Sequence, residues 1–445
     1  MRINSSTKGT EAKISPSTYG GGVGSKIKPL EELRRSVLTC MLFENTFYEK
    51  GSDVADRIKD LVTKNKPQDV ALLAREARDR MNLRHTPLFL IRELARMKGN
   101  GPLVAETLEH CIQRASDLTD FMALYFKDGK QPLSAGVKRG LAKAFNKFNA
   151  YHLAKYDRKE TVKLRDVLFL SHPKPKDDAQ KLAFDQLASS TLPVPDTWET
   201  ALSSGANKKE TWERLLSEGK LGGLAVLRNL RNMQNEKVDE TLIRTRLTEG
   251  IAKAMPYRFI AAAKYAPTLE DSIEQAMFKA SEGMEPLSGT TAILVDVSGS
   301  MDYVLSAKSD MNRLDAASAL SIYLREKSGN VKVGTFSFNF VEVAPRRGFA
   351  LSEAISSSQS HGGTALGNSL KEAKEKWGNI DRLIVVTDEQ SSDKIIPWWG
   401  PKDRAYIVNV APYSVGVGYK DGYIHINGWS EAIIDYILET EKASY

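Results

Sequence analysis

Cysteine is scarce in this sequence, and long apolar runs are missing. Its 445 residues include only two cysteines, Cys40 and Cys111, too few for a disulfide framework or a thiolate metal site. No run approaches the roughly 18 consecutive apolar residues that a membrane span needs. Residues 1–25 lack the apolar segment of a secretory signal peptide. These absences predict a reduced, cytoplasmic protein with two structural thiols.

Signatures of common catalytic sites are also missing. The sequence has no G-x-x-x-x-G-K-[ST] phosphate loop, and the glycine-rich residues 20–24 follow no predicted strand. No Ser/His/Asp or Cys/His arrangement is suggested either. We therefore expect that the chain is not an enzyme and that residues 1–28 form a flexible N-terminal lead-in.

Charge is present in excess, and it is unevenly distributed. The chain has 63 Lys and Arg against 56 Asp and Glu, a net charge of +7. Residues 1–286 hold 47 basic and 37 acidic residues, whereas residues 287–445 hold 16 and 19. A basic region joined to a mildly acidic one favours a polyanionic partner for the basic region, although solvated helix faces also carry Lys and Arg.

Residues 29–286 show the periodicity of helices. Apolar residues recur at i, i+3 and i+4, and Gly and Pro separate the stretches. Helices of this length with short links fit a stack of antiparallel pairs, a HEAT-like solenoid. The predicted helical stretches are 30–47, 54–62, 70–81, 89–97, 103–112, 137–148, 164–170, 182–187, 212–216, 224–233 and 242–254.

The pattern changes at residue 287. Short apolar runs, typical of buried strands, alternate with amphipathic helices, which predicts a doubly wound, Rossmann-like α/β domain over 287–445 with helices on both faces of a parallel sheet. Such sheets bind ligands at the carboxyl ends of their strands. The predicted strands are 291–295, 331–338, 382–387 and 405–410, and the helices are 314–327, 366–377 and 431–438.

Oxygen-bearing side chains gather at those strand ends. Asp296, Ser298 and Ser300 follow the first strand, Thr364 lies in a glycine-rich loop, and Asp388 ends the third strand. Two carboxylates and three hydroxyls suit a hard divalent cation, most simply Mg²⁺. The set resembles the metal-ion-dependent adhesion site of von Willebrand factor A domains.

The helical region resembles the TROVE module of Ro 60-kDa proteins. The resemblance rests on five sequence blocks that occur in family order: residues 33–48, 86–88, 168–175, 224–230 and 256–259. It implies a closed, monomeric ring of HEAT-like helices whose ends are held by the A domain. It also implies binding of small non-coding Y RNAs on a basic outer surface, entry of the 3′ ends of misfolded RNAs into the hole, and cooperation with an exoribonuclease in RNA quality control, maturation or decay.

Basic residues supply the RNA-binding candidates. Lys138 and Lys143 share one helix face, and a second basic cluster ends at His172. Basic side chains grouped in this way bind the phosphates of a nucleic acid without regard to its sequence. By resemblance, Lys155, Lys159 and His172 match positions tied to Y RNA binding, whereas Phe169 stands where the family often has Arg. The predicted RNA-binding residues are Lys138, Lys143, Lys155, Arg158, Lys159, Lys163 and His172.

A run of arginines between residues 75 and 96 is a further candidate. These residues either line the hole of the ring, where Arg suits phosphate and base contacts, or pair with Glu76, Asp79 and Glu93. The sequence leaves both readings open.

Two other functions remain open. A protein-adhesion scaffold would use the cation to bind a carboxylate of a partner, but it has no need of the basic helical region. A metal-dependent phosphoesterase would use Asp296 and Asp388, but the sequence offers no general base or nucleophile beside them.

Overall fold

The computed structural model describes residues 5–6, 9–10, 16–157, 161–203, 207–251, 254–307 and 309–443. The chain forms two compact units. The sheet unit comprises Met1–Arg57 and Glu213–Tyr445, and the helical unit comprises Ile58–Trp212.

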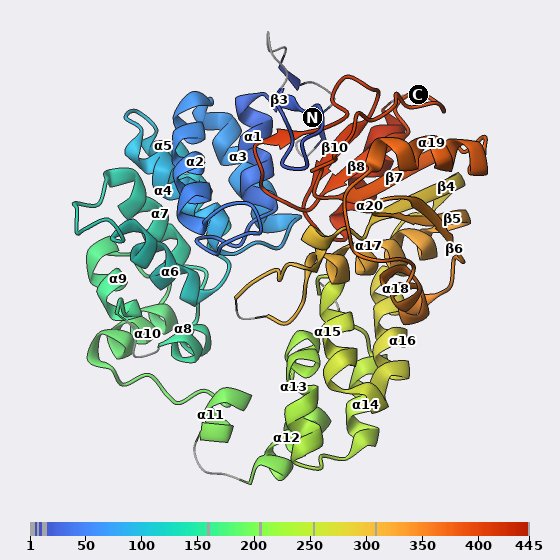
Figure 1. Ribbon diagram of the computed structural model, residues 1–445. Coiled ribbons are helices and arrows are strands. Elements are labelled where there is room, and N and C mark those ends of the chain that lie inside the picture. Colours follow the sequence, from blue (N-terminus) through green and yellow to red (C-terminus); the bar gives the residue numbers. More distant parts are fainter. Residues whose placement is uncertain are drawn as a thin grey trace. The chain divides into compact units, whose positions relative to one another are not determined.

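The helical unit is built of helices stacked in two rows. Helices α3, α5, α7 and α9 pack one on the next, as do α4, α6 and α8, with α10 on α8 and α9. Figure 1 shows them following one another from blue to green. This is the predicted HEAT-like stacking. The helices are α2 (Gly51–Lys64), α3 (Pro67–Asp79), α4 (His85–Arg96), α5 (Gly101–Cys111), α6 (Ala115–Tyr125), α7 (Ala135–Phe145), α8 (Ala150–Tyr156), α9 (Leu164–Ser171), α10 (Asp178–Ser189) and α11 (Trp198–Ser203).

Local sequence explains where these helices begin and how closely they pack. Ser134 and Asn149 cap α7 and α8 by accepting hydrogen bonds from backbone N–H groups of the first turn. Gly136 lets α7 approach α5, because a Cβ at this position would lie 2.8 Å from the Cα of Gly101.

The sheet unit contains helices from both ends of the predicted helical region. The helix α1 precedes the helical unit, α12 spans the boundary at Trp212, and α13–α16 follow it. The helices α15 and α16 pack on α17. Their bounds are α1 (Pro29–Leu38), α12 (Lys208–Ser217), α13 (Gly223–Asn235), α14 (Glu240–Thr248), α15 (Tyr257–Tyr265), η1 (Pro267–Leu269) and α16 (Glu270–Ser281).

The sheet has the order β1-β10-β8-β7-β4-β5-β6. Its five central strands are parallel, whereas β1 and β6 are antiparallel edges. This confirms the predicted α/β domain. The elements are β4 (Leu287–Asp296), η2 (Gly299–Asp302), α17 (Arg313–Lys327), β5 (Ser328–Phe336), β6 (Phe340–Val343), α18 (Gly348–Ser356), α19 (Leu366–Trp377), β7 (Arg382–Thr387), β8 (Ala405–Asn409), β9 (Val415–Gly416), β10 (Ile424–Asn427) and α20 (Ala432–Lys442).

Alternating strand residues build the core of the sheet. Ala292 and Leu294 of β4 pack with the apolar side chains of α19, including Leu370 and Trp377. The helix α17 contacts β4 and β5. Because the helices pack on the faces of the sheet, the loops that follow the parallel strands lie at its carboxyl edge.

The N-terminal segment is part of the sheet unit, although we expected a flexible lead-in over residues 1–28. Strand β1 (Ser5–Ser6) pairs with β10, and β3 (Ser25–Ile27) pairs with β2 (Gly9–Thr10) and β9. The Thr18 hydroxyl donates to the Ser391 carbonyl at 2.5 Å. A Cβ at Gly22 would overlap that same carbonyl, so the glycines at this point serve close backbone packing.

The first helix ends earlier than its periodicity predicts. The pattern predicts a helix over residues 30–47, but α1 ends at Leu38. Phe43 has a φ of 65°, and a Cβ at Gly51 would overlap the Phe43 backbone. The prediction is wrong because residues 41–50 turn away from the helix axis and contact the loops of the sheet.

Among the described residues, no helix has both the length and the apolar character needed to cross a membrane.

Candidate functional site

Two neighbouring parallel strands bring the predicted carboxylates together. Strands β4 and β7 pair along their length and end at the same edge, with Asp296 and Asp388 at their carboxyl ends. The Thr387 hydroxyl donates to Asp296 Oδ2 at 2.6 Å, which fixes this carboxylate across the strand pair.

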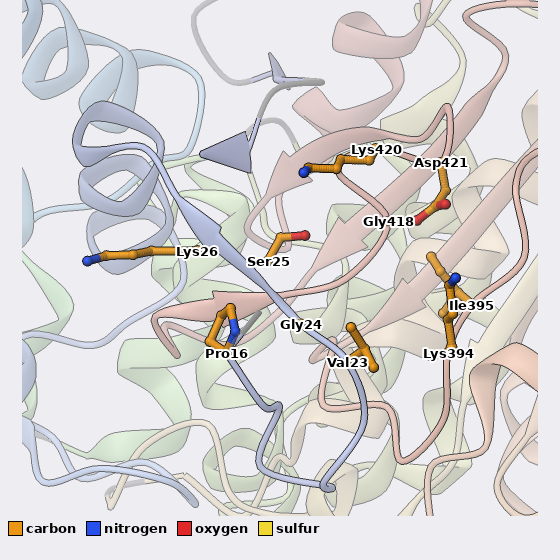
Figure 2. A pocket seen from close by; sticks show the side chains of 10 residues that line it. All are labelled: Pro16, Val23, Gly24, Ser25, Lys26, Lys394, Ile395, Gly418, Lys420 and Asp421. Atoms are coloured by element: carbon orange, nitrogen blue, oxygen red, sulfur yellow. The ribbon is translucent and has the colours of Figure 1, made fainter. Parts of the chain in front are cut away.

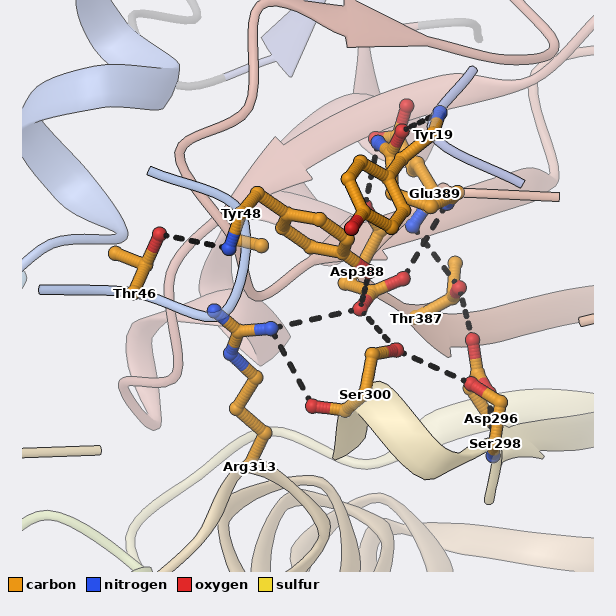
Figure 3. A network of polar contacts seen from close by, with 12 residues as sticks. Tyr19, Thr46, Tyr48, Asp296, Ser298, Ser300, Arg313, Thr387, Asp388 and Glu389 are labelled. Atoms are coloured by element: carbon orange, nitrogen blue, oxygen red, sulfur yellow. Dashed lines mark hydrogen bonds and ion pairs between the residues drawn. The ribbon is translucent and has the colours of Figure 1, made fainter. Parts of the chain in front are cut away.

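The turn after β4 adds two hydroxyls. The Ser298 backbone N–H donates to Asp296 Oδ1 at 2.9 Å, and the Oγ atoms of Ser298 and Ser300 are 3.3 Å apart. Ser300 Oγ donates to Asp388 Oδ2 at 2.6 Å. Figure 3 shows this chain of contacts. Four of the five predicted cation ligands therefore lie together.

The fifth predicted ligand, Thr364, lies in the loop before α19. This loop reaches the turn after β4, because the Gly299 N–H donates to the Gly362 carbonyl at 3.0 Å. The Thr364 carbonyl accepts from Ser392 N–H at 2.7 Å. In the part of the chain that the structure describes, the Thr364 hydroxyl makes no hydrogen bond to the other four predicted ligands.

The buried charges of this site favour a cation. Asp296 and Asp388 are both 0% exposed, and burial together with the charge of Asp388 raises the pKa of Asp296 to about 7. In the described residues, no group of three or more His, Cys, Asp or Glu side chains forms a metal site, so a cation here would need the hydroxyl oxygens. Two buried carboxylates with hydroxyls fit a hard ion such as Mg²⁺.

Two residues at this site were missed by the sequence analysis. Tyr48 Oη donates a hydrogen bond to Asp388 Oδ2, and Arg313 Nη1 lies 3.5 Å from the same oxygen. Burial, reinforced by the charge of Asp388, raises the pKa of Tyr48, so its hydroxyl stays protonated and donates. Nothing in the local pattern around residue 48 signals this contact, because its partner lies 340 residues away.

A buried ion cluster anchors α1 beside the site. Arg35 Nη1 lies 2.9 Å from Glu389 Oε1, and His425 Nδ1 lies 3.2 Å from the same oxygen. Burial alone would raise the pKa of Glu389, but Arg35 and then His425 outweigh it and lower the pKa. The pairing of Arg35 with Glu389 therefore holds the end of α1 close to Asp388.

Five of the seven predicted RNA-binding residues lie in described parts of the helical unit: Lys138 and Lys143 on α7, Lys155 on α8, and Lys163 and His172 at the two ends of α9. Lys138, Lys143 and Lys163 are exposed, and Lys155 is half-buried. Lys143 pairs with Glu109 at 3.3 Å. His172 is exposed and ends α9 in a left-handed conformation with a φ of 48°. Arg158 and Lys159 lie outside the described residues.

The arginines of α3, of α4 and of the link between them mostly face carboxylates of the same unit. Arg78 and Arg84 share Asp117 at 2.6 and 3.0 Å. Arg92 pairs with Asp128 and lies 3.4 Å from Glu93, and Arg96 lies 3.2 Å from Glu93. These contacts favour the reading in which the arginines hold neighbouring helices together.

A cavity of about 250 Å³ lies between the N-terminal segment and the loops of the sheet. Lys26, Lys394 and Lys420 are among its lining residues. Figure 2 shows that their ammonium groups do not converge on one point, so the cavity is not built as an anion site.

Comparisons with known proteins agree with these observations. Residues 189–284 match the family model of the TROVE domain. A segment of 107 residues is 30% identical to telomerase protein component 1 of Mus musculus; it covers 22% of this chain and 4% of that relative.

A solved structure resembles nearly the whole chain. It is the crystal structure of the Deinococcus radiodurans RO (RSR) protein, with a TM-score of 0.61 and 17% sequence identity. The likeness covers 94% of this chain and 100% of that one. Residues 189–284 therefore resemble a TROVE domain, and the chain shares the fold of that solved structure.

Proposed function

We propose that this chain is an RNA-binding protein that forms a ribonucleoprotein with small structured, Y-like non-coding RNA. Its role would be quality control, maturation or decay of non-coding RNA in the cytoplasm. The TROVE match and the Ro fold support the class of protein. The RNA partner and the role are proposals.

The observation that carries the proposal is the location of the positive charge. The helical unit has 27 basic and 19 acidic residues, a net of +8, whereas the sheet unit has 36 and 37, a net of −1. Lys138, Lys155 and Lys163 have no ion pair within the described residues, unlike most arginines of α3 and α4. Basic groups in such positions are available to phosphates.

In this mechanism the protein binds and positions RNA and breaks no bond. Lysines on α7–α9 would contact the backbone of a structured RNA, and His172 would contact an unpaired base. The 3′ end of a misfolded RNA would enter the hole of a closed, monomeric ring, and an exoribonuclease would act on it. A divalent cation, Mg²⁺, would be held by Asp296, Ser298, Ser300, Thr364 and Asp388, where it would neutralise the buried carboxylates.

The adhesion alternative has less support. An adhesion site presents an open cation to a partner carboxylate, whereas Asp388 here is covered by Tyr48 and Arg313. The net charge of the helical unit also has no role in that alternative.

A salt-titrated gel shift tests the RNA proposal. The wild-type protein should bind a structured RNA with a free 3′ tail more tightly than a blunt hairpin or duplex DNA. Replacing Lys138 and Lys163 by Ala should weaken binding by ~1–3 kcal/mol and flatten the salt dependence, because each lost phosphate contact removes about one released counterion.

The matched control replaces two exposed lysines of the sheet unit, Lys371 and Lys374 on α19, by Ala. Their loss should change neither affinity nor slope. Weak wild-type binding without preference for RNA would contradict the proposed function.

A further inference from the structure

The segment that follows α1 reaches the cation site at its outer side. Tyr48 donates its hydroxyl to Asp388 Oδ2, the oxygen that also accepts from Ser300. Figure 3 shows Tyr48 and Arg313 on one side of Asp388, and Asp296 and Ser298 on the other. The phenol therefore lies on the side of Asp388 that is opposite Asp296.

Neighbouring aromatic rings hold the phenol in this position. The rings of Tyr19, Phe47 and Tyr413 lie 4.9, 5.1 and 5.4 Å from the Tyr48 ring. The guanidinium of Arg313 lies 5.4 Å from the same ring, in cation–π range. The position of the Tyr48 ring is thus fixed by contacts with four side chains.

A second contact ties the same segment to the loop that follows η2 (Gly299–Asp302). The carboxylate of Glu44 accepts from the Ser306 hydroxyl at 2.9 Å and from the Ala307 N–H at 2.6 Å. Both partners follow η2, the turn that contains Ser300. The segment is therefore held at Asp388 and again at the loop beyond Ser300.

We infer that residues 43–49 are the internal ligand of this cation site: the Tyr48 phenol occupies the outward position that an external carboxylate would take. The cation then fastens the N-terminal segment to the sheet rather than presenting itself to a partner. The inference rests on the proposed cation site and is independent of RNA binding.

Terbium(III) provides a direct test, because its luminescence is sensitised by a tyrosine held close to the ion. Wild-type protein titrated with Tb³⁺ should show saturable emission on tyrosine excitation, and Mg²⁺ should compete it away. Tyr48→Phe should lose most of this emission, while calorimetry shows that Tb³⁺ still binds.

Two matched variants control for two of the neighbouring tyrosines. Tyr413 and Tyr303 lie in the same aromatic group, the first beside Tyr48 and the second beside Arg313 and Phe47. Tyr413→Phe and Tyr303→Phe should keep most of the emission. Retained emission in Tyr48→Phe, with Tb³⁺ bound, would overturn the inference but leave the cation site standing. Absence of saturable Tb³⁺ binding to the wild type would overturn both.

Luminescence lifetimes in H₂O and D₂O separate an internal ligand from a mere neighbour. They count the water molecules on bound Tb³⁺. Tyr48→Ala should bind more water than the wild type, and added acetate should then displace it. An unchanged water count in this variant, or displacement of water by acetate in the wild type, would show an open site and contradict the inference.

Discussion

At the residue scale, the buried charges at the end of β7 are divided between two sets of partners. Asp388 directs its Oδ2 atom to Ser300, Tyr48 and Arg313, whereas the next residue, Glu389, turns to Arg35 and His425. The two neighbouring carboxylates therefore lie in different environments. Asp388 contacts Ser300 in the turn after β4, and Glu389 binds Arg35 of α1.

Five cation ligands could be proposed from the sequence because each follows a recognisable strand or opens a helix. Tyr48 and Arg313 could not. Their position depends on contacts between segments far apart in the chain, and a tyrosine or an arginine in a loop carries no local signal of such a contact.

His361 gives a pH-dependent prediction at the same scale. Its Nδ1 lies 2.8 Å from Asp302 Oδ2 and its Nε2 lies 3.0 Å from the Ser356 carbonyl. Burial alone would lower the pKa of His361, but the hydrogen bonds to Asp302 and Ser356 outweigh it and raise the pKa. The charged imidazole therefore stabilises the fold below its ordinary pKa of about 6.5, and this contribution is lost as the pH rises through the raised value.

Replacing Asp302 by Asn should reveal this contribution. The variant should lose about 0.5–1 kcal/mol of unfolding free energy relative to the wild type at pH 5.5, a small loss because the pair is partly exposed. The loss should be smaller at pH 8.5, where the imidazole of His361 is less charged. Chemical denaturation at both pH values measures the difference. An equal loss at both would show that the charge of His361 does not contribute.

At the element scale, many helices and strands were predicted from their periodicity, whereas the helices α6, α15, α16 and α18 were missed. Strand β7 and helix α19 have the bounds that their patterns predict, since buried strands and amphipathic helices carry their own periodicity. The four-residue strand β10 was missed; it contains His425, which is buried because it faces Glu389. Residues 39–47 have helical spacing, yet Phe47 packs against Tyr48 and Tyr303 beside the predicted cation ligands instead. A long-range contact here overrides a local preference.

The close approach of the N-terminal segment predicts a sensitive glycine. A methyl group at Gly22 would overlap the Ser391 carbonyl and lie 2.9 Å from the Asp393 carbonyl. Gly22→Ala should therefore lower the free energy of unfolding by about 1–3 kcal/mol, because backbone atoms cannot yield as a flexible side chain does.

Gly329→Ala is the control for this change. Nothing lies within 4 Å of a Cβ at Gly329, so this variant should unfold close to the wild-type midpoint. Denaturant titration of both variants is the measurement. Equal midpoints would mean that residues 16–24 contribute little to the stability of the sheet unit.

At the scale of the whole molecule, the two proposed binding functions lie in different units. The RNA-binding candidates belong to the helical unit and the cation site to the sheet unit. Residues that belong to two separate compact units should contribute independently to stability and to binding. The charge distribution leads to the same expectation, since the excess positive charge belongs to the helical unit.

Ser298→Ala tests that independence. Mg²⁺ at 100 times its dissociation constant should stabilise the wild-type protein by about 2.7 kcal/mol, because the ion binds only the folded state. The variant loses a hydroxyl donor, so its melting temperature should respond much less to Mg²⁺ or to its removal by a chelator. Its affinity for structured RNA should stay at the wild-type level, because the lysines of α7–α9 are unchanged. If RNA affinity instead fell together with the response to Mg²⁺, the cation would be supporting the RNA-binding surface, and the two sites would have to be treated as one linked system.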